Sequence, residues 1–223
     1  MLLAVDGIQV NQAKNDGWAP LNFACQEGHS KVVEMLLAMD DIQVNQATNK
    51  GSTPLNAACY GGHSIVVKKL LAVDDIQVNQ ADNDGFTPLT GACGKGHSKV
   101  VEILLAVGDI QVNQASEDGG TPLYKACWEN HLDVVKLLLA ASGIQVNQTN
   151  NNGFAPLYVA CEKGHLKVVE RLLAMGDIRV NQANNNGWTS LYVACRKGHL
   201  KVVKTLLAVD GIQVNQGNDN GYT

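Results

Sequence analysis

The stretch NNGFAPLYVACEKGHLKVVERLLA, residues 151–174, returns almost unchanged as NNGWTSLYVACRKGHLKVVKTLLA at residues 185–208. The two copies begin 34 positions apart, and more divergent copies keep that spacing back to the start of the chain. Self-similarity at a fixed period of this size is typical of repeat architectures. The period never slips, which leaves no room for an inserted domain or a linker.

The period predicts one elongated domain, residues 1–223, with a partial repeat at either end, 1–13 and 218–223. The full repeats are predicted at 14–47, 48–81, 82–115, 116–149, 150–183 and 184–217. Both ends of the chain fall inside a repeat and lack the polar capping repeats that solenoids need for solubility. We therefore expect the chain to be a segment of a longer array.

The third repeat shows which secondary structure each part of the period predicts. Asn-Asp-Gly at 83–85 is a turn signal, and Thr87-Pro88 then supplies a helix cap and a favourable first helical residue. Gly96 predicts the end of that short helix. Segment 98–107 has its apolar residues at helical spacing, so it predicts a second helix with a broad buried stripe. The alternating DIQVNQA at 109–115 predicts an extended arm into the next turn.

A helix pair of this size cannot bury its own apolar stripe, so successive repeats must stack to share a core. The recurring pattern G-x-T-P-L-x-x-A-C-x-x-G-H-x-x-V-V-x-x-L-L-A closely resembles the ankyrin repeat, and the VN after it resembles that family's DVN. The resemblance covers the whole chain. It implies an all-α repeat solenoid, in which helix-loop-helix units joined by β-hairpin-like arms stack into a right-handed curved array.

The chain departs from the family in three respects. Its period is one residue longer than the usual length of about 33, and we expect the extra residue, near Asp40-Asp41 and its equivalents, to lengthen the loop after the second helix. The family's TPLH histidine is absent. Cysteine replaces the second alanine of the usual pair in every repeat.

Composition excludes several classes of protein. The formal net charge is −4, which leaves no electrostatic footprint for nucleic acid. No apolar run is long enough to insert into a membrane, and the opening residues do not resemble a signal peptide. These features point to an intracellular protein, in the cytoplasm or the nucleus.

The six cysteines and six histidines recur with the period, which predicts structural roles for them. Equivalent residues of stacked helices lie about 8–10 Å apart, too far for a disulfide. Zinc needs four ligands, whereas each repeat offers one Cys and one His separated by a helix-ending glycine. We therefore expect a column of buried thiols, histidines bonded to backbone groups of a neighbouring loop, and asparagines of VN linking adjacent arms, with no metal and no cofactor.

Every polar candidate for catalysis also recurs with the period, so no asymmetric active site is predicted, and we expect neither catalytic residues nor a small-molecule substrate. Function must lie where the repeats differ. The resemblance implies that the turn tips and first helices line a concave groove that binds another protein or peptide. The candidate partner-binding residues are Asp16, Trp18, Lys50, Tyr60, Asp84, Phe86, Asp118, Trp128, Glu129, Asn152, Phe154, Glu162, Asn186, Trp188 and Arg196.

Each repeat carries one large ring at one of two neighbouring positions, either after the turn glycine or after the cysteine. These rings either pack locally or form a row of anchors for a partner. Local packing is the stronger hypothesis for most repeats, and we expect Trp128 to be the exception because Gly120 leaves space in front of it. Tyr124, Tyr158 and Tyr192 are expected to add phenol groups to the same face.

Two functions follow from the sequence. The first is a non-catalytic scaffold that binds a polypeptide partner through the concave groove. The alternative is a structural spacer within a longer repeat array. The second helices also vary, at Lys31, Ser64, Asp133 and Lys201, so the sequence leaves this alternative open.

Overall fold

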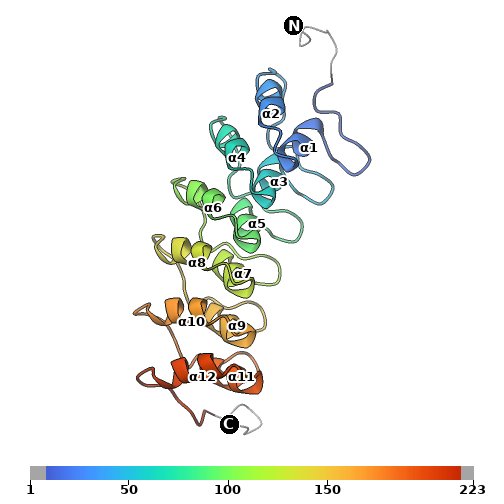
Figure 1. Ribbon diagram of the computed structural model, residues 1–223. Helices are drawn as coiled ribbons and strands as arrows, with labels where there is room; N and C mark the ends of the chain where they lie inside the picture. The colour runs from blue at the N-terminus through green and yellow to red at the C-terminus, as the bar shows by residue number, and fades with distance from the viewer. Residues whose placement is uncertain (1–8, 217–223) are drawn as a thin grey trace.

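The computed structural model describes residues 9–216, which form a single curved column of helix pairs (Figure 1). The first helices of the pairs are α1 (Pro20–Gln26), α3 (Pro54–Gly61), α5 (Pro88–Lys95), α7 (Pro122–Trp128), α9 (Pro156–Lys163) and α11 (Ser190–Arg196). The second helices are α2 (Ser30–Leu37), α4 (Ser64–Leu71), α6 (Ser98–Leu105), α8 (Leu132–Leu139), α10 (Leu166–Leu173) and α12 (Leu200–Leu207). Within residues 9–216 the only strand-like element is an isolated bridge between Ala183 and Thr189. The all-α solenoid is therefore confirmed.

The first helices begin and end where the sequence predicts. The Thr87 side chain accepts a hydrogen bond from the Thr90 N–H, and Pro88 stands at the first helical position. Gly96 ends α5 with a left-handed φ of 75°. In α7 the equivalent position is Asn130, which adopts the same conformation with a φ of 62°. Asparagine tolerates this region better than other residues with a Cβ, so the helix pair survives the loss of its glycine.

The core is a continuous column that every pair extends. Leucine and valine from both helices of a pair are almost fully buried against the neighbouring pairs. The cysteines lie on the inner face of the first helices, and Cys25, Cys59, Cys93, Cys127 and Cys161 are fully buried and free of disulfides. Burial raises the pKa of the Cys25 thiol to about 12. Cys195 lies in the last described pair and is exposed.

The arms form hairpin-like turns rather than paired strands. In the arm before α5, the Gly85 N–H donates to the Asp82 carbonyl at 2.9 Å, and the Asp82 N–H donates to the Phe86 carbonyl at 3.0 Å. Neighbouring turn tips are joined as well, since the Glu117 N–H donates to the Asp84 carbonyl at 3.0 Å. The tips therefore form a continuous hydrogen-bonded edge along the column.

The DIQVNQA segment is not extended throughout, and that part of the prediction is wrong. A tight turn at 112–113 is closed by the Gln114 N–H donating to the Gln111 carbonyl at 3.3 Å. The turn presents Asn113 to the next arm, where its Nδ2 donates to the Gly143 carbonyl at 2.8 Å and its Oδ1 accepts from the Gln145 N–H at 2.9 Å. The predicted role of the VN asparagine is confirmed, and it explains why the segment curls.

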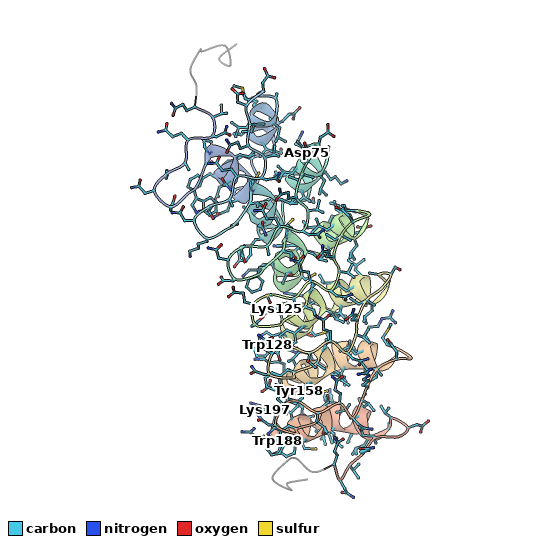
Figure 2. All side chains as sticks on the ribbon, turned by 180° about the vertical axis from the view of Figure 1, so that it is seen from behind. Asp75, Lys125, Trp128, Tyr158, Trp188 and Lys197 are labelled. Atoms are coloured by element: carbon cyan, nitrogen blue, oxygen red, sulfur yellow. The ribbon has the colours of Figure 1, made fainter. Side chains whose placement is uncertain are left out.

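Asp41 and its equivalents, near which the additional residue of each period was expected, lie in the loop after the second helix. This loop supplies the carbonyl groups that the preceding VN asparagines bind. Asp75 belongs to one such loop and has a left-handed φ of 62° (Figure 2). Its carbonyl accepts from Asn45 Nδ2 at 2.9 Å.

The histidines bond to the preceding repeat, as expected, but the acceptor differs from the prediction. His97 Nε2 lies 2.9 Å from the Tyr60 carbonyl, and His165 Nε2 lies 3.2 Å from the Trp128 carbonyl. These acceptors are at the end of a first helix, not amides of a loop. The last carbonyls of a helix lack intrahelical partners, and five histidines each satisfy one of them in the preceding repeat: His63, His97, His131, His165 and His199.

The column bends toward the side formed by the first helices and arms (Figure 1). The first helices of neighbouring pairs contact one another more extensively than the second helices do. Closer packing on one side of a stack curves it toward that side. The first helices and turn tips therefore line the concave face, and the second helices line the outer face.

We predict that Asn113→Ala lowers the free energy of unfolding by about 1 kcal/mol, because it removes two hydrogen bonds between adjacent arms. Urea denaturation followed by circular dichroism measures this loss. Gln111→Ala is the control, since Gln111 is exposed and only its backbone is bonded. Equal midpoints for the two variants would contradict the role given to Asn113.

The thiols offer a second test of the stack. We expect a disulfide-exchange reagent to modify Cys195 rapidly in the native protein, since Cys195 is exposed. The other five cysteines are buried, so the reagent should modify them only after the protein unfolds. Six thiols should react at once in denaturant. Rapid modification of several thiols under native conditions would show that the column is not packed as described.

Candidate interaction surface

The predicted site residues lie on turn tips and on the exposed side of the first helices. Labelled members of this set, Trp128 and Trp188, lie along the side of the column formed by the first helices and arms (Figure 2). We call this side the concave strip. The structure thus brings the predicted positions onto one continuous face, although the residues come from six successive repeats.

The rings that follow the turn glycines are half-buried against their own repeats. Phe154 lies 4.8 Å from Tyr158 and Trp188 lies 3.8 Å from Tyr192, measured between ring centroids. Trp18 lies 4.9 Å from Phe23 in the same manner. These rings therefore pack locally, and only part of each ring's surface is accessible to a partner.

Trp128 is packed as well, contrary to the expectation. Its ring stacks on Tyr124 with centroids 6.1 Å apart, and Lys163 Nζ lies 3.9 Å from the ring centroid. A cation above an aromatic face is a stabilising arrangement. Trp128 is therefore held by its own repeat and by the next one.

The space that Gly120 was expected to leave is occupied. A Cβ built at Gly120 would lie 2.8 Å from Lys125 Cε, so the lysine side chain crosses that position. Lys125 Nζ lies 2.7 Å from Asp118 Oδ2 and 4.9 Å from the Phe86 ring centroid. The expectation was wrong because a side chain from the following helix fills the gap.

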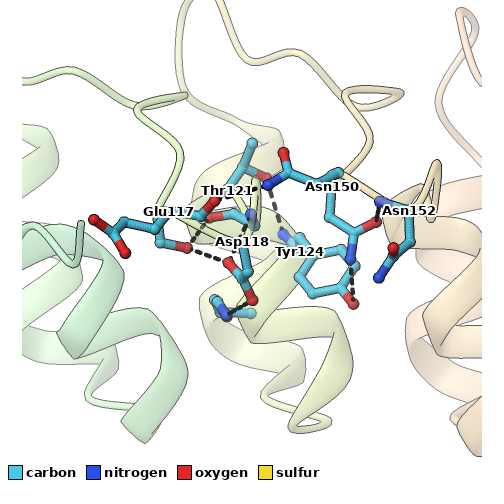
Figure 3. Close-up of polar contacts among 10 residues, drawn as sticks. Glu117, Asp118, Thr121, Tyr124, Asn150 and Asn152 are labelled. Carbon is cyan, nitrogen blue, oxygen red and sulfur yellow. Dashed lines mark hydrogen bonds and ion pairs between the residues drawn. The ribbon is translucent and has the colours of Figure 1, made fainter. Parts of the chain in front are cut away.

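Asp118 anchors this small polar cluster (Figure 3). Its Oδ1 accepts hydrogen bonds from Ser116 Oγ at 2.6 Å and from the Gly120 N–H at 3.0 Å. Partial burial opposes ionisation of Asp118, but the bonds from Lys125, Ser116 and Gly120 outweigh it and lower its pKa to about 2. The carboxylate is thus ionised and largely engaged within its own repeat.

Two of the tyrosines point into the stack rather than toward a partner. Tyr124 and Tyr158 are 5% and 6% exposed. Asn150 Nδ2 donates to the Tyr124 hydroxyl at 3.3 Å (Figure 3), and Asn184 Nδ2 lies 3.5 Å from the Tyr158 hydroxyl. Burial raises the pKa of both phenols to about 12. The expected row of phenol groups on the concave strip is therefore wrong for these two residues.

The remaining candidates are mostly exposed. Glu162 is half-buried, 3.8 Å from Lys197 Nζ, and Asp16 Oδ1 accepts from the Trp18 N–H at 3.2 Å. Tyr60 is the most exposed ring, at 58%, and lies under Lys95 Nζ at 4.5 Å from the ring centroid. The other exposed candidates are Lys50, Asp84, Glu129, Asn152, Asn186 and Arg196.

The lysines that cover the rings were not among the predicted partner-binding residues. Lys95 follows Tyr60 by 35 positions, and Lys163 follows Trp128 by the same number. A spacing one greater than the period places the lysine of one repeat beside the ring of the preceding repeat. That signal was present in the sequence, but the contact depends on how the lysine side chains fold back over the rings.

We predict that Lys163→Met lowers the free energy of unfolding by about 0.5–1 kcal/mol, because it removes the cation from the Trp128 face and keeps an aliphatic side chain. Urea denaturation measures the change. In a Trp128→Ala background the same substitution should have little effect. Lys201→Met is the control, because Lys201 is an exposed lysine on a second helix. A loss at Lys163 no larger than at Lys201 would contradict the contact.

Residues 9–216 contain neither a cluster of metal-ligating side chains nor a membrane-spanning helix. No group of three or more His, Cys, Asp or Glu side chains lies close enough together to hold a metal ion. No helix in this range is long and apolar enough to cross a bilayer.

Comparison with solved structures supports the architecture. The human ASB11 ankyrin repeat domain is 29% identical, with a TM-score of 0.80 over 92% of this chain and 90% of that one. The ankyrin repeat protein EF0377 matches in fold, with a TM-score of 0.79 over 89% of this chain and 100% of that one at 24% identity. Among curated proteins, none matches the chain.

The family comparison covers nearly the whole sequence. The family model described as "Ankyrin repeats (3 copies)" matches residues 1–82, 41–116, 67–150 and 142–218. The matched segments contain all twelve helices of residues 9–216, and the paired helices, hairpin-like turns and stacked core agree with that family. The chain therefore belongs to the ankyrin repeat family.

Proposed function

We propose that the chain is a non-catalytic scaffold that binds a polypeptide partner along the concave strip. Ankyrin repeats mediate protein–protein interaction, and this family membership sets the class of function. The finer proposal is that the partner lies on the concave strip. It rests on the exposed side chains there that have no partner within residues 9–216.

The observation that carries the proposal is the division between periodic and variable polar residues. Many of the periodic polar groups already have a structural partner. His97 binds the preceding helix, Asn113 binds the next arm, and Thr87 caps its own helix. The variable side chains at 50, 84, 129 and 196 are exposed and, in residues 9–216, form no ion pair. Side chains without a structural role are the ones available to a partner.

The strip also has the chemistry of a protein-binding surface. It combines half-buried aromatic rings with exposed charges of both signs, and aromatic and arginine residues are enriched at protein interfaces. Asp84 carries negative charge at a turn tip, whereas Arg196 carries positive charge toward the C-terminal end. Such a surface favours an extended polypeptide that contacts several repeats.

The spacer function remains the alternative. The packing of the aromatic rings against their own repeats supports this alternative, because a spacer needs only stacked repeats. Under that alternative, substitutions on the concave strip and on the outer face should affect binding of other proteins equally.

We predict that Asp84→Lys combined with Arg196→Glu abolishes capture of partner proteins that the unchanged chain retains. The double variant keeps the net charge and alters two exposed residues, so folding should be preserved. The measurement is affinity capture from cell lysate with quantitative mass spectrometry, after circular dichroism confirms the fold. Asp74→Lys combined with Lys201→Glu is the matched variant, since both residues are exposed on or beside second helices. Identical capture by both variants would favour the spacer.

A further inference from the structure

A ladder of side-chain pairs crosses the concave strip from one repeat to the next. The residue after each cysteine faces the second residue after the cysteine in the following repeat. Lys95 lies over Tyr60, Lys163 lies over Trp128, and Lys197 lies 3.8 Å from Glu162. In each pair a lysine covers a ring or a carboxylate of the preceding repeat.

Two steps of this ladder lack a lysine. The first pairs Gln26 with Gly61, and the second, which we call the empty step, also lacks a side chain at the covered position. The equivalent pair between the third and fourth repeats is Gly94 and Glu129, which offers neither a side chain to cover nor a lysine to cover it. Glu129 is exposed, and within residues 9–216 it forms no ion pair. Gly91, one turn earlier in α5, also lacks a side chain, although the equivalent Ala57, Val159 and Val193 are buried between repeats.

Within residues 9–216, no packing contact requires glycine at positions 91 and 94 of α5. Both adopt ordinary helical backbone, because neither Gly91 nor Gly94 has a positive φ. A Cβ at Gly91 would lie 3.9 Å from Tyr60 Cδ2, and one at Gly94 would lie 3.9 Å from Lys125 Cβ. These are ordinary van der Waals distances, so alanine would fit at either position. Glycine inside a helix destabilises it relative to alanine, and here no internal contact offsets that loss.

We infer that a basic side chain of the partner, arginine or lysine, completes the empty step. Its aliphatic stem lies on the bare surface of α5 beside Tyr60, and its cation pairs with Glu129. This inference rests on the proposed function and specifies which chemistry the middle of the concave strip binds.

Charge around the empty step agrees with a cationic occupant. Asp84 and Glu117 are exposed on the adjacent turn tips and carry no ion pair in residues 9–216. The nearby lysines are engaged within the chain, since Lys95 lies over the Tyr60 ring, Lys163 lies over the Trp128 ring and Lys125 pairs with Asp118. A long aliphatic stem with a charged end covers apolar surface and reaches a carboxylate at the same time, which suits this step.

The test uses a phage-displayed library of random twelve-residue peptides selected on the full chain. We expect selected peptides to share an arginine or lysine. Glu129→Gln should weaken their binding about tenfold to a hundredfold, because it removes a charge-assisted contact without changing shape. Fluorescence anisotropy with synthetic copies of the peptides measures the change. Gly108→Ala is the control, since a Cβ at this exposed loop residue meets nothing within 4 Å.

A second variant separates binding from folding. Gly94→Trp combined with Glu129→Lys copies the Trp128–Lys163 pair into the empty step. We expect this variant to fold normally and to lose the basic peptides. Gly91→Ala and Gly94→Ala should each raise the midpoint of thermal unfolding by about 2–4 °C, because alanine favours the helix.

The outcomes distinguish this inference from the proposed function. Selected peptides that lack a common basic residue, or that bind Glu129→Gln unchanged, would overturn the inference and leave the concave strip as a peptide site. A lower midpoint for both alanine variants would also overturn it, because the glycines would then serve the fold. If the unchanged chain selects no peptide at all, both the inference and the proposed function fail.

Discussion

Contact between neighbouring repeats is the constraint on which the structure depends. A pair of helices of seven or eight residues has two apolar sides, and only another pair can cover them. The same neighbour completes the polar groups, because His97 reaches back to one repeat while Asn113 reaches forward to the next arm. Apolar burial and hydrogen bonding therefore depend on the same interface, and neither is complete within one repeat. Position in the stack shows the effect: Val66 and Val100 are 1% exposed, whereas the equivalent Val32 in the first described pair is 46% exposed.

This constraint also decides where function can lie. Many residues that recur with the period join one repeat to the next, and a residue engaged in that way is poorly placed to do chemistry or to bind a partner. The concave strip is different because its side chains vary while the backbone below them repeats. Closer packing of the first helices bends the column toward the strip, so exposed side chains from successive repeats converge on the same side.

Most of the fold could be predicted from the sequence, because period, caps and apolar spacing are local or strictly repeated signals. Thr87, Pro88 and Gly96 define α5 by their own conformational preferences, and the structure agrees. The DIQVNQA arm was predicted less well, because alternation of apolar and polar residues does not distinguish a strand from a turn that presents an asparagine. The surface was hardest to predict. Whether Lys125 fills the space at Gly120, or Tyr124 turns toward Asn150, depends on the length and rotamer of side chains from different repeats.

The same architecture explains how one repeat can lose side chains on the strip without losing its fold. The inner face of α5 is buried by α3 on one side and α7 on the other, so Leu89, Ala92 and Cys93 remain fully buried. These residues stabilise the column, whereas Gly94 lies on the opposite side of the same short helix. A central repeat therefore tolerates bare backbone on its concave side more readily than an end repeat, which has one neighbour fewer. In such a stack the side chains of the concave strip can change residue by residue, because the interface that folds the chain lies on a different face of each helix.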